Sequence, residues 1–164
     1  MNIREATSGD AEAIADIQIA SWRFAYRGIM DDTILDSMDR SKKISAWIEA
    51  IDTLGWSVFV SEANGKITGF IHISEYRDSD LDTSTVGEIA SLYISPELVG
   101  TGVGASLFSE GIHQLKQQGY ANVALWVLEQ NSRSIAFYEK FGFRRDGASK
   151  THPKTGLKEV KYVR

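Results

Sequence analysis

The spacing of apolar residues changes several times along this chain, and each change predicts the end of one element and the start of another. From about residue 11 to residue 26 the apolar positions recur every three or four residues, as on a helix, with Ser8 as the expected cap. Gly28 ends that helix. A second helical stretch, in two pieces, is expected over residues 32–51.

After Gly55 the pattern becomes the two-residue alternation of strands. Residues 56–62 and 66–76 are rich in β-branched and aromatic side chains, and the turn 63–66 between them predicts a hairpin. Alternation in the second strand predicts two faces, with Ile67, Gly69, Ile71 and Ile73 on one and Thr68, Phe70 and His72 on the other. The polar residues 77–85 predict a loop.

The second half of the chain mixes strands and helices. We expect a strand over 86–95 stopped by Pro96, a glycine-rich loop, a helix over 102–118 and a strand over 121–128. A helix over 131–140 then ends at Gly142, and two closing strands cover 143–148 and 157–163. The sequence contains no repeat, low-complexity tract or linker, which predicts one mixed α/β domain over residues 1–164.

Composition and charge exclude several classes of protein. Hydrophobic residues make up 43% and charged residues 24%, and 18 basic against 22 acidic residues give a net charge of −4, which argues against nucleic-acid binding. The absence of cysteine excludes disulfides, a thiolate zinc site and a cysteine nucleophile, and the three histidines lack metal-ligand spacing. No signal peptide or apolar run of about 18 residues is present, so we expect a cytoplasmic protein without a membrane segment.

The candidate chemistry begins with the glycine-rich loop between a strand and a helix. Gly100, Gly102 and Gly104 permit unusual backbone angles and the close approach of an anion to the free N–H groups of a helix start. A simple glycine cap is one interpretation. The loop formally fits a dinucleotide-binding fingerprint, but intervening residues separate it from its strand and no carboxylate follows at the required distance. A phosphate-binding P-loop would need a lysine that is absent here.

In its spacing the loop resembles that of the GNAT family of N-acetyltransferases, whose signature is Gln or Arg, two residues, Gly, one residue, then Gly or Ala. The matching segment here is Val99-Gly100-Thr101-Gly102-Val103-Gly104, followed by Ala105. The departure is Val99, where the family generally has Arg or Gln. Because the family holds the pyrophosphate of coenzyme A largely with main-chain amides, the resemblance still implies an acetyl-coenzyme A site in this loop.

A second segment resembles the same family independently. Asn131, Ser134 and Tyr138, followed by Gly142 and Phe143, are similar to the family's downstream helix, and their spacing places the first three on one helix face. A capping asparagine and a core tyrosine would be the alternative. The resemblance implies a mixed, mostly antiparallel central sheet of about six to seven strands flanked by helices, with the coenzyme between two central strands that splay apart at a bulge.

The resemblance also implies roles for individual residues. Glu88 stands where some members carry a general base, and Tyr138 corresponds to the tyrosine that protonates the coenzyme sulfur. Main-chain groups of Leu92, Tyr93 and Ile94 would bind the pantetheine arm and the acetyl carbonyl, while Asn131 would hold the arm. Trp22 and Tyr26, four residues apart, are candidates for a wall of the acceptor site, with core packing as the alternative.

The predicted activity is transfer of acetyl from acetyl-coenzyme A to a primary amine, without an acyl-enzyme or a metal. A coenzyme-A-binding sensor that has lost turnover is the alternative, favoured only by Val99. An oxidoreductase using NAD is the third class, and it would show itself by binding NADH. The acceptor, a small molecule or a peptide, and the oligomeric state, including a homodimer, are left open by the sequence.

Overall fold

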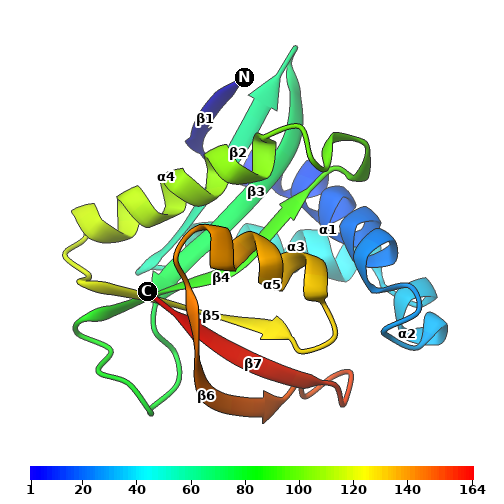
Figure 1. The fold of residues 1–164 in the computed structure, drawn as a ribbon. Helices are drawn as coiled ribbons and strands as arrows, with labels where there is room; N and C mark the ends of the chain where they lie inside the picture. The colour runs from blue at the N-terminus through cyan, green and yellow to red at the C-terminus, as the bar shows by residue number, and fades with distance from the viewer.

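The computed structural model describes all residues from 1 to 164 and arranges seven strands into one twisted sheet (Figure 1). The strands are β1 (Asn2–Glu5), β2 (Trp56–Ala63), β3 (Lys66–Glu75), β4 (Val86–Ile94), β5 (Asn122–Leu128), β6 (Arg144–Thr151) and β7 (Lys158–Val163). The helices are α1 (Ala11–Tyr26), α2 (Asp32–Asp36), α3 (Arg40–Asp52), α4 (Val103–Gln117) and α5 (Ser132–Lys140). None of these helices is long and apolar enough to cross a membrane.

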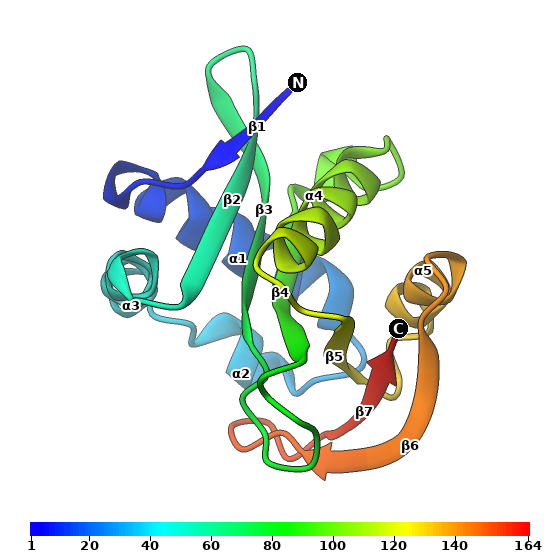
Figure 2. The ribbon, with the colours of Figure 1, turned by 90° about the vertical axis from the view of Figure 1, so that its left-hand side faces the viewer.

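The strand order is β1-β2-β3-β4-β5-β7-β6, and every neighbouring pair is antiparallel except β4 and β5. Helices α1 and α3 cover one face of the sheet, whereas α4 and α5 lie on the other (Figure 2). The expected mixed, mostly antiparallel sheet flanked by helices is therefore confirmed. The predicted helical stretch 32–51 is also confirmed as two pieces, α2 and α3.

Each face of the sheet has its own apolar core. On one face, Val58, Val60 and Phe70 pack with side chains of α1 and with Trp47 of α3. On the other face, α4 lies very close to the sheet, because a Cβ atom at Gly111 would come within 2.4 Å of the Ile71 side chain. The two cores fix the helices on opposite sides of the sheet, and the functional site is built where β4 separates from β5.

Strand β4 bends at a bulge and then separates from β5. His72 of β3 pairs with Ser91 and Ile73 pairs with Ile89, so that Ala90 is the extra residue on β4. The parallel pairing with β5 covers only the first three residues of β4 and ends at Glu88. Beyond that point the two strands splay apart, as the family resemblance implied, and the gap leaves main-chain groups of β4 free for a ligand.

Two local expectations were wrong. The cap before α1 is not Ser8: the segment Ser8–Asp10 forms a short 3-10 turn, and the Asp10 carboxylate accepts a hydrogen bond from the Thr7 amide at 2.8 Å. In β3, Ile67 packs on the Phe70 side rather than with Ile71. The cause is a second bulge, at Thr68, where pairing with β2 passes from Gly69 directly to Ile67 and reverses the alternation.

Candidate active site

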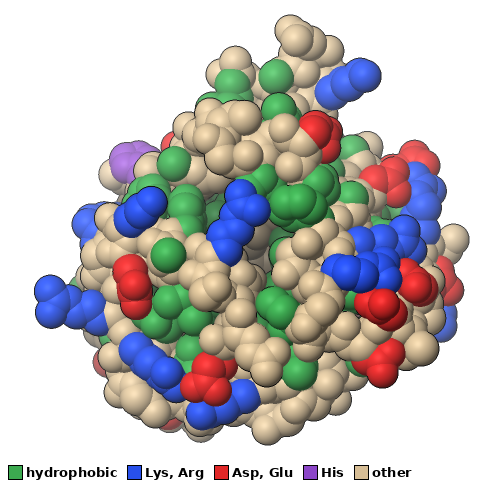
Figure 3. All heavy atoms as spheres, turned by 45° about the vertical axis from the view of Figure 1, so that its right-hand side comes forward, with side chains coloured by type: hydrophobic (Ala, Val, Ile, Leu, Met, Phe, Trp, Pro, Cys, Tyr) green, Lys and Arg blue, Asp and Glu red, His purple; other side chains and the backbone are tan.

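A cavity of about 1240 Å³ runs between the splayed strands and is bordered by α1, α4 and α5. The space-filling view shows a hollow with hydrophobic side chains inside it and Lys or Arg side chains around it (Figure 3). Of the residues predicted from sequence, Thr101 and Val103 are not part of its wall. The others line it: Trp22, Tyr26, Glu88, Leu92, Tyr93, Ile94, Val99, Gly100, Gly102, Gly104, Ala105, Asn131, Ser134 and Tyr138.

The glycine loop forms one end of the cavity with a row of free amides. Gly100 and Gly102 have φ values of 89° and 98°, a conformation that glycine adopts without strain, and Gly102 directly precedes α4. The N–H groups of Gly100 and of residues 102–105 donate no hydrogen bond within the protein. Thr101 differs, because its amide donates to the Leu98 carbonyl at 3.2 Å. The loop therefore offers main-chain donors and the positive end of a 15-residue helix to an anion.

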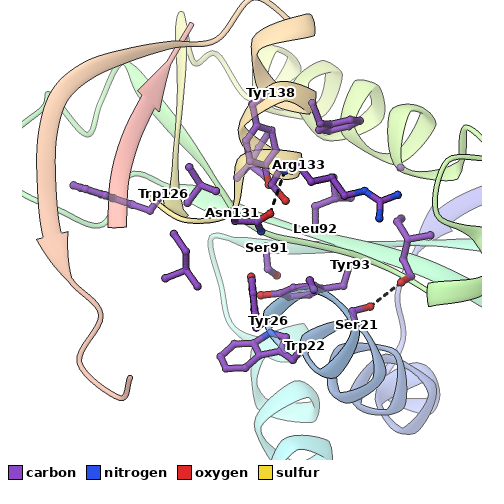
Figure 4. Close-up of a pocket in the computed structure, with 18 of the residues that line it drawn as sticks. Ser21, Trp22, Tyr26, Ser91, Leu92, Tyr93, Trp126, Asn131, Arg133 and Tyr138 are labelled. Carbon is purple, nitrogen blue, oxygen red and sulfur yellow. Dashed lines mark hydrogen bonds between the residues drawn. The ribbon is translucent and has the colours of Figure 1, made fainter. Parts of the chain in front are cut away.

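The edge of β4 that faces the gap supplies main-chain groups of alternate residues. Ser95 donates to the Thr68 carbonyl, and the antiparallel alternation from that bond directs the N–H and C=O groups of Leu92 and Ile94 away from β3. The Ile94 carbonyl accepts a hydrogen bond from the Ser21 hydroxyl of α1 at 2.7 Å (Figure 4). The expected main-chain role of Tyr93 is wrong, because its N–H and C=O groups point toward β3. Tyr93 lines the cavity with its side chain instead.

Helix α5 brings Asn131 and Tyr138 to the opposite side of the gap (Figure 4). The Asn131 side chain caps the helix by accepting from the Ser134 amide at 3.2 Å, so the capping interpretation is correct and coexists with its place in the wall. The Tyr138 ring packs 5.4 Å from the Phe108 ring, and no protein group hydrogen-bonds its hydroxyl. Burial, together with nearby Tyr93, raises the pKa of Tyr138, so its phenol keeps the proton at neutral pH.

Glu88 lies in the wall but is held by a partner that the sequence did not indicate. Its side chain is 3% exposed, and Arg77 binds both carboxylate oxygens, at 2.7 Å through Nη2 and at 3.1 Å through Nε. The Arg77 main-chain amide donates to the same carboxylate at 3.2 Å. These bonds raise the pKa of Arg77 and fix the orientation of Glu88 at the last residue that pairs with β5.

The aromatic residues form the wall on the α1 side of the sheet. Trp22 and Tyr26 meet edge to face at 5.4 Å, and Trp126 of β5 stands across the gap from them (Figure 4). Sequence reasoning missed Trp126 as well as Ser21, Arg77 and Glu159, all of which line the cavity. For Glu159 the sequence gives no local signal, because alternation in the last strand places it on the face away from the apolar Val160, as for any polar residue of a half-exposed strand.

The histidines divide between core, surface and cavity. His72 is buried with its Nε2 unpaired, and burial lowers its pKa to about 4. His113 is exposed on α4. His152 lies in the wall of the cavity, 6.4 Å from the Trp22 ring. No group of three or more His, Asp or Glu side chains is arranged to hold a metal ion.

The site combines a splayed parallel pair of strands with a helix that begins with free amides, an arrangement suited to a ligand that carries a phosphate group. The profile of the Acetyltransferase (GNAT) family matches residues 12–143. The chain therefore belongs to this family, and it is an acyltransferase of the acetyl-coenzyme A-dependent N-acetyltransferase class.

Individual relatives agree with this assignment. An uncharacterized N-acetyltransferase of Methanocaldococcus jannaschii is 30% identical over 86% of this chain, which corresponds to 59% of that relative. The L-amino acid N-acyltransferase MnaT of Escherichia coli is 32% identical over 87% of this chain and 79% of its own length.

Solved structures share the fold. The PaiA N-acetyltransferase of Thermoplasma acidophilum, solved with coenzyme A, has a TM-score of 0.81 at 23% identity and covers 98% of this chain and 96% of its own. The yncA protein of Salmonella typhimurium, solved with acetyl-CoA, has a TM-score of 0.75 at 27% identity, with coverage of 100% and 92%. These neighbours confirm the fold, and in both of those proteins the fold holds coenzyme A or acetyl-CoA.

Proposed function

We propose that this protein transfers the acetyl group of acetyl-coenzyme A directly to the primary amine of a small molecule. One observation carries the proposal: the free amides of residues 100, 102, 104 and 105, the outward main-chain groups of β4 and the Tyr138 hydroxyl all border one cavity. The amides suit the pyrophosphate, and the β4 edge suits the amide-containing pantetheine arm. The arm then ends between β4 and α5, where Tyr138 lies.

The reaction needs one group to receive a proton and another to supply one. A free alkyl amine has a pKa of about 10 and is mostly protonated at neutral pH. Glu88, oriented by Arg77, is proposed to take that proton through water, because Arg77 occupies both carboxylate oxygens directly. The neutral nitrogen then forms a bond to the acetyl carbon while the carbon–sulfur bond breaks. The thiolate takes the Tyr138 proton, and the second proton shed by the nitrogen restores the phenol.

The small size of the acceptor is supported by the cavity and by a relative. On the proposed acceptor side the cavity is lined by the large side chains of Trp22, Tyr26 and Trp126, which suits a small molecule more than a protein segment. MnaT, named for L-amino acids, aligns with 87% of the chain. An acceptor of that size, with one primary amine, is the proposed substrate.

The test is release of coenzyme A thiol from acetyl-coenzyme A over a panel of amines, with Tyr138→Phe and Glu88→Gln. Tyr138→Phe keeps the ring against Phe108, so we expect kcat to fall about a hundredfold and the Kd of acetyl-coenzyme A to stay unchanged. Tyr120→Phe is the matched control, because Tyr120 lies outside the cavity. Unchanged turnover in Tyr138→Phe would contradict the proton-donor role. Tight coenzyme binding without turnover of any amine would instead favour the sensor.

A further inference from the structure

Three carboxylates line the cavity, and their partners differ. Glu88 is bound by Arg77, and Asp78 is bound by Lys150 at 2.7 Å. Glu159 has no hydrogen bond or ion pair from its side chain. It is the one lining carboxylate whose charge is left for a ligand.

The arrangement of β6 and β7 explains why Glu159 stays free. Lys150 lies directly opposite it in the ladder, yet the Lys150 ammonium bonds to Asp78 and sits 4.1 Å from the Trp126 ring centre. The next cation on the same face of β7, Lys161, is held by Asp80 and Asp146. Both lysines therefore form their ion pairs with carboxylates of the loop before β4 or of β6, and neither pairs with Glu159. Burial raises the pKa of Glu159, as expected for a carboxylate with no cationic partner in contact.

The surroundings of Glu159 are aromatic and apolar. Its ladder partner on β5 is Leu128. Trp126 precedes Leu128 by two residues on β5 and therefore lies on the same face of the sheet. Leu128 packs with Trp22 and Tyr26. The resulting chamber has one free negative charge within walls that suit an apolar body and can stack on a cation.

We propose that Glu159 binds the ammonium group of the acceptor, and that the acceptor carries this single ammonium on an apolar body. The proposal rests on the proposed acetyl transfer and adds the residue that recognises the substrate and the class it selects. The chamber has only one unpaired carboxylate, so a polyamine is excluded, because its second ammonium would be buried there without a partner. Glu159 is a binding residue here: it holds the ammonium as the acceptor enters, and Glu88 takes a proton from that same nitrogen through water in the proposed transfer.

Binding of amines is the direct test, since it does not require turnover. Calorimetric titration of 2-phenylethylamine, L-methionine and spermidine into the coenzyme A complex compares the wild type with Glu159→Gln and Glu159→Asp. We expect 2-phenylethylamine to bind more tightly than spermidine, and its Kd to rise at least about tenfold in Glu159→Gln, as for loss of a charged hydrogen bond. Glu159→Asp keeps the charge and should recover part of the affinity. In thiol release, KM should rise by the same factor with kcat little changed.

Glu129→Gln is the matched control, because Glu129 is a carboxylate on the neighbouring loop that pairs with Arg145 and Lys158 outside the cavity. Equal Kd values in the wild type and Glu159→Gln, tighter binding of spermidine, or no binding of either monoamine would overturn the inference. Failure of acetyl transfer is a separate result: amines that bind through Glu159 without thiol release would refute the proposed function alone.

Discussion

Burial of His72 makes the free energy of unfolding depend on pH, and this dependence can be measured directly. The ring lies 4.8 Å from that of Trp56 and 5.9 Å from that of Trp47, and its Nε2 has no hydrogen-bond partner. Burial lowers the pKa of His72 from 6.5 to about 4, with a smaller effect of Arg77. Between these two values the unfolded chain binds a proton that the folded chain does not. The free energy of unfolding must therefore fall as the pH falls through this window.

The magnitude follows from the width of the window. Each pKa unit corresponds to about 1.4 kcal/mol, so lowering the pH from about 7 to about 5 should remove about 2 kcal/mol of stability through His72. Protonation of Asp10, whose pKa is held down by Arg4, contributes only at lower pH. Replacing His72 with Phe, which suits the aromatic surroundings, should abolish this part of the pH dependence.

Urea unfolding at several pH values measures the effect. We expect the stability difference between His72→Phe and the wild type to shift by about 2 kcal/mol in favour of the variant from about pH 7 to about pH 5. His113→Phe is the control, because His113 is exposed on α4. A difference that stays constant over this range would show that His72 is not buried as a neutral ring.

Three further changes test the cavity. Gly102→Ala introduces a Cβ at φ 98°, so the Kd of acetyl-coenzyme A measured by calorimetry should rise about tenfold. Gly119→Ala is the control: it carries similar strain at φ 97° but lies outside the cavity, so the Kd should stay unchanged. Arg77→Gln leaves Glu88 buried without its cation, and the unfolding free energy in urea should drop by about 3 kcal/mol; a loss below about 1 kcal/mol would contradict the structural role of the pair. Val99→Arg should tighten acetyl-coenzyme A about threefold at low salt and less at high salt, and a salt-independent Kd would refute an electrostatic contact.

The parts of the site that sequence could predict are those made by neighbouring residues. Gly100 and Gly102 have the left-handed angles that their position required, and α5 begins at the asparagine whose side chain caps it. In each case the residues that determine the geometry lie within one turn of one another. The order of elements followed from the same short-range patterns.

The parts that sequence could not predict depend on residues far apart in the chain. The Ser21 hydroxyl meets the Ile94 carbonyl across 73 positions, and Arg77 reaches Glu88 only because β3 and β4 lie side by side. The bulge at Thr68 reversed the expected face of Ile67, since one extra residue changes a two-residue alternation. Glu159 was missed because nothing local distinguishes an unpaired carboxylate from one that has a partner.

The gap between β4 and β5 has a consequence for inhibitor chemistry. Its wall combines Gly104 of α4 and Tyr138 of α5, from one layer, with Trp22 and Tyr26 of α1 from the other. In the proposed transfer, acetyl-coenzyme A and the acceptor therefore approach from opposite layers and meet within the thickness of the sheet. A single compound that joins the sulfur of coenzyme A to the acceptor nitrogen through a two-carbon link would thread this opening and occupy both halves at once. Its affinity would report the alignment that the splayed strands impose on the two reactants.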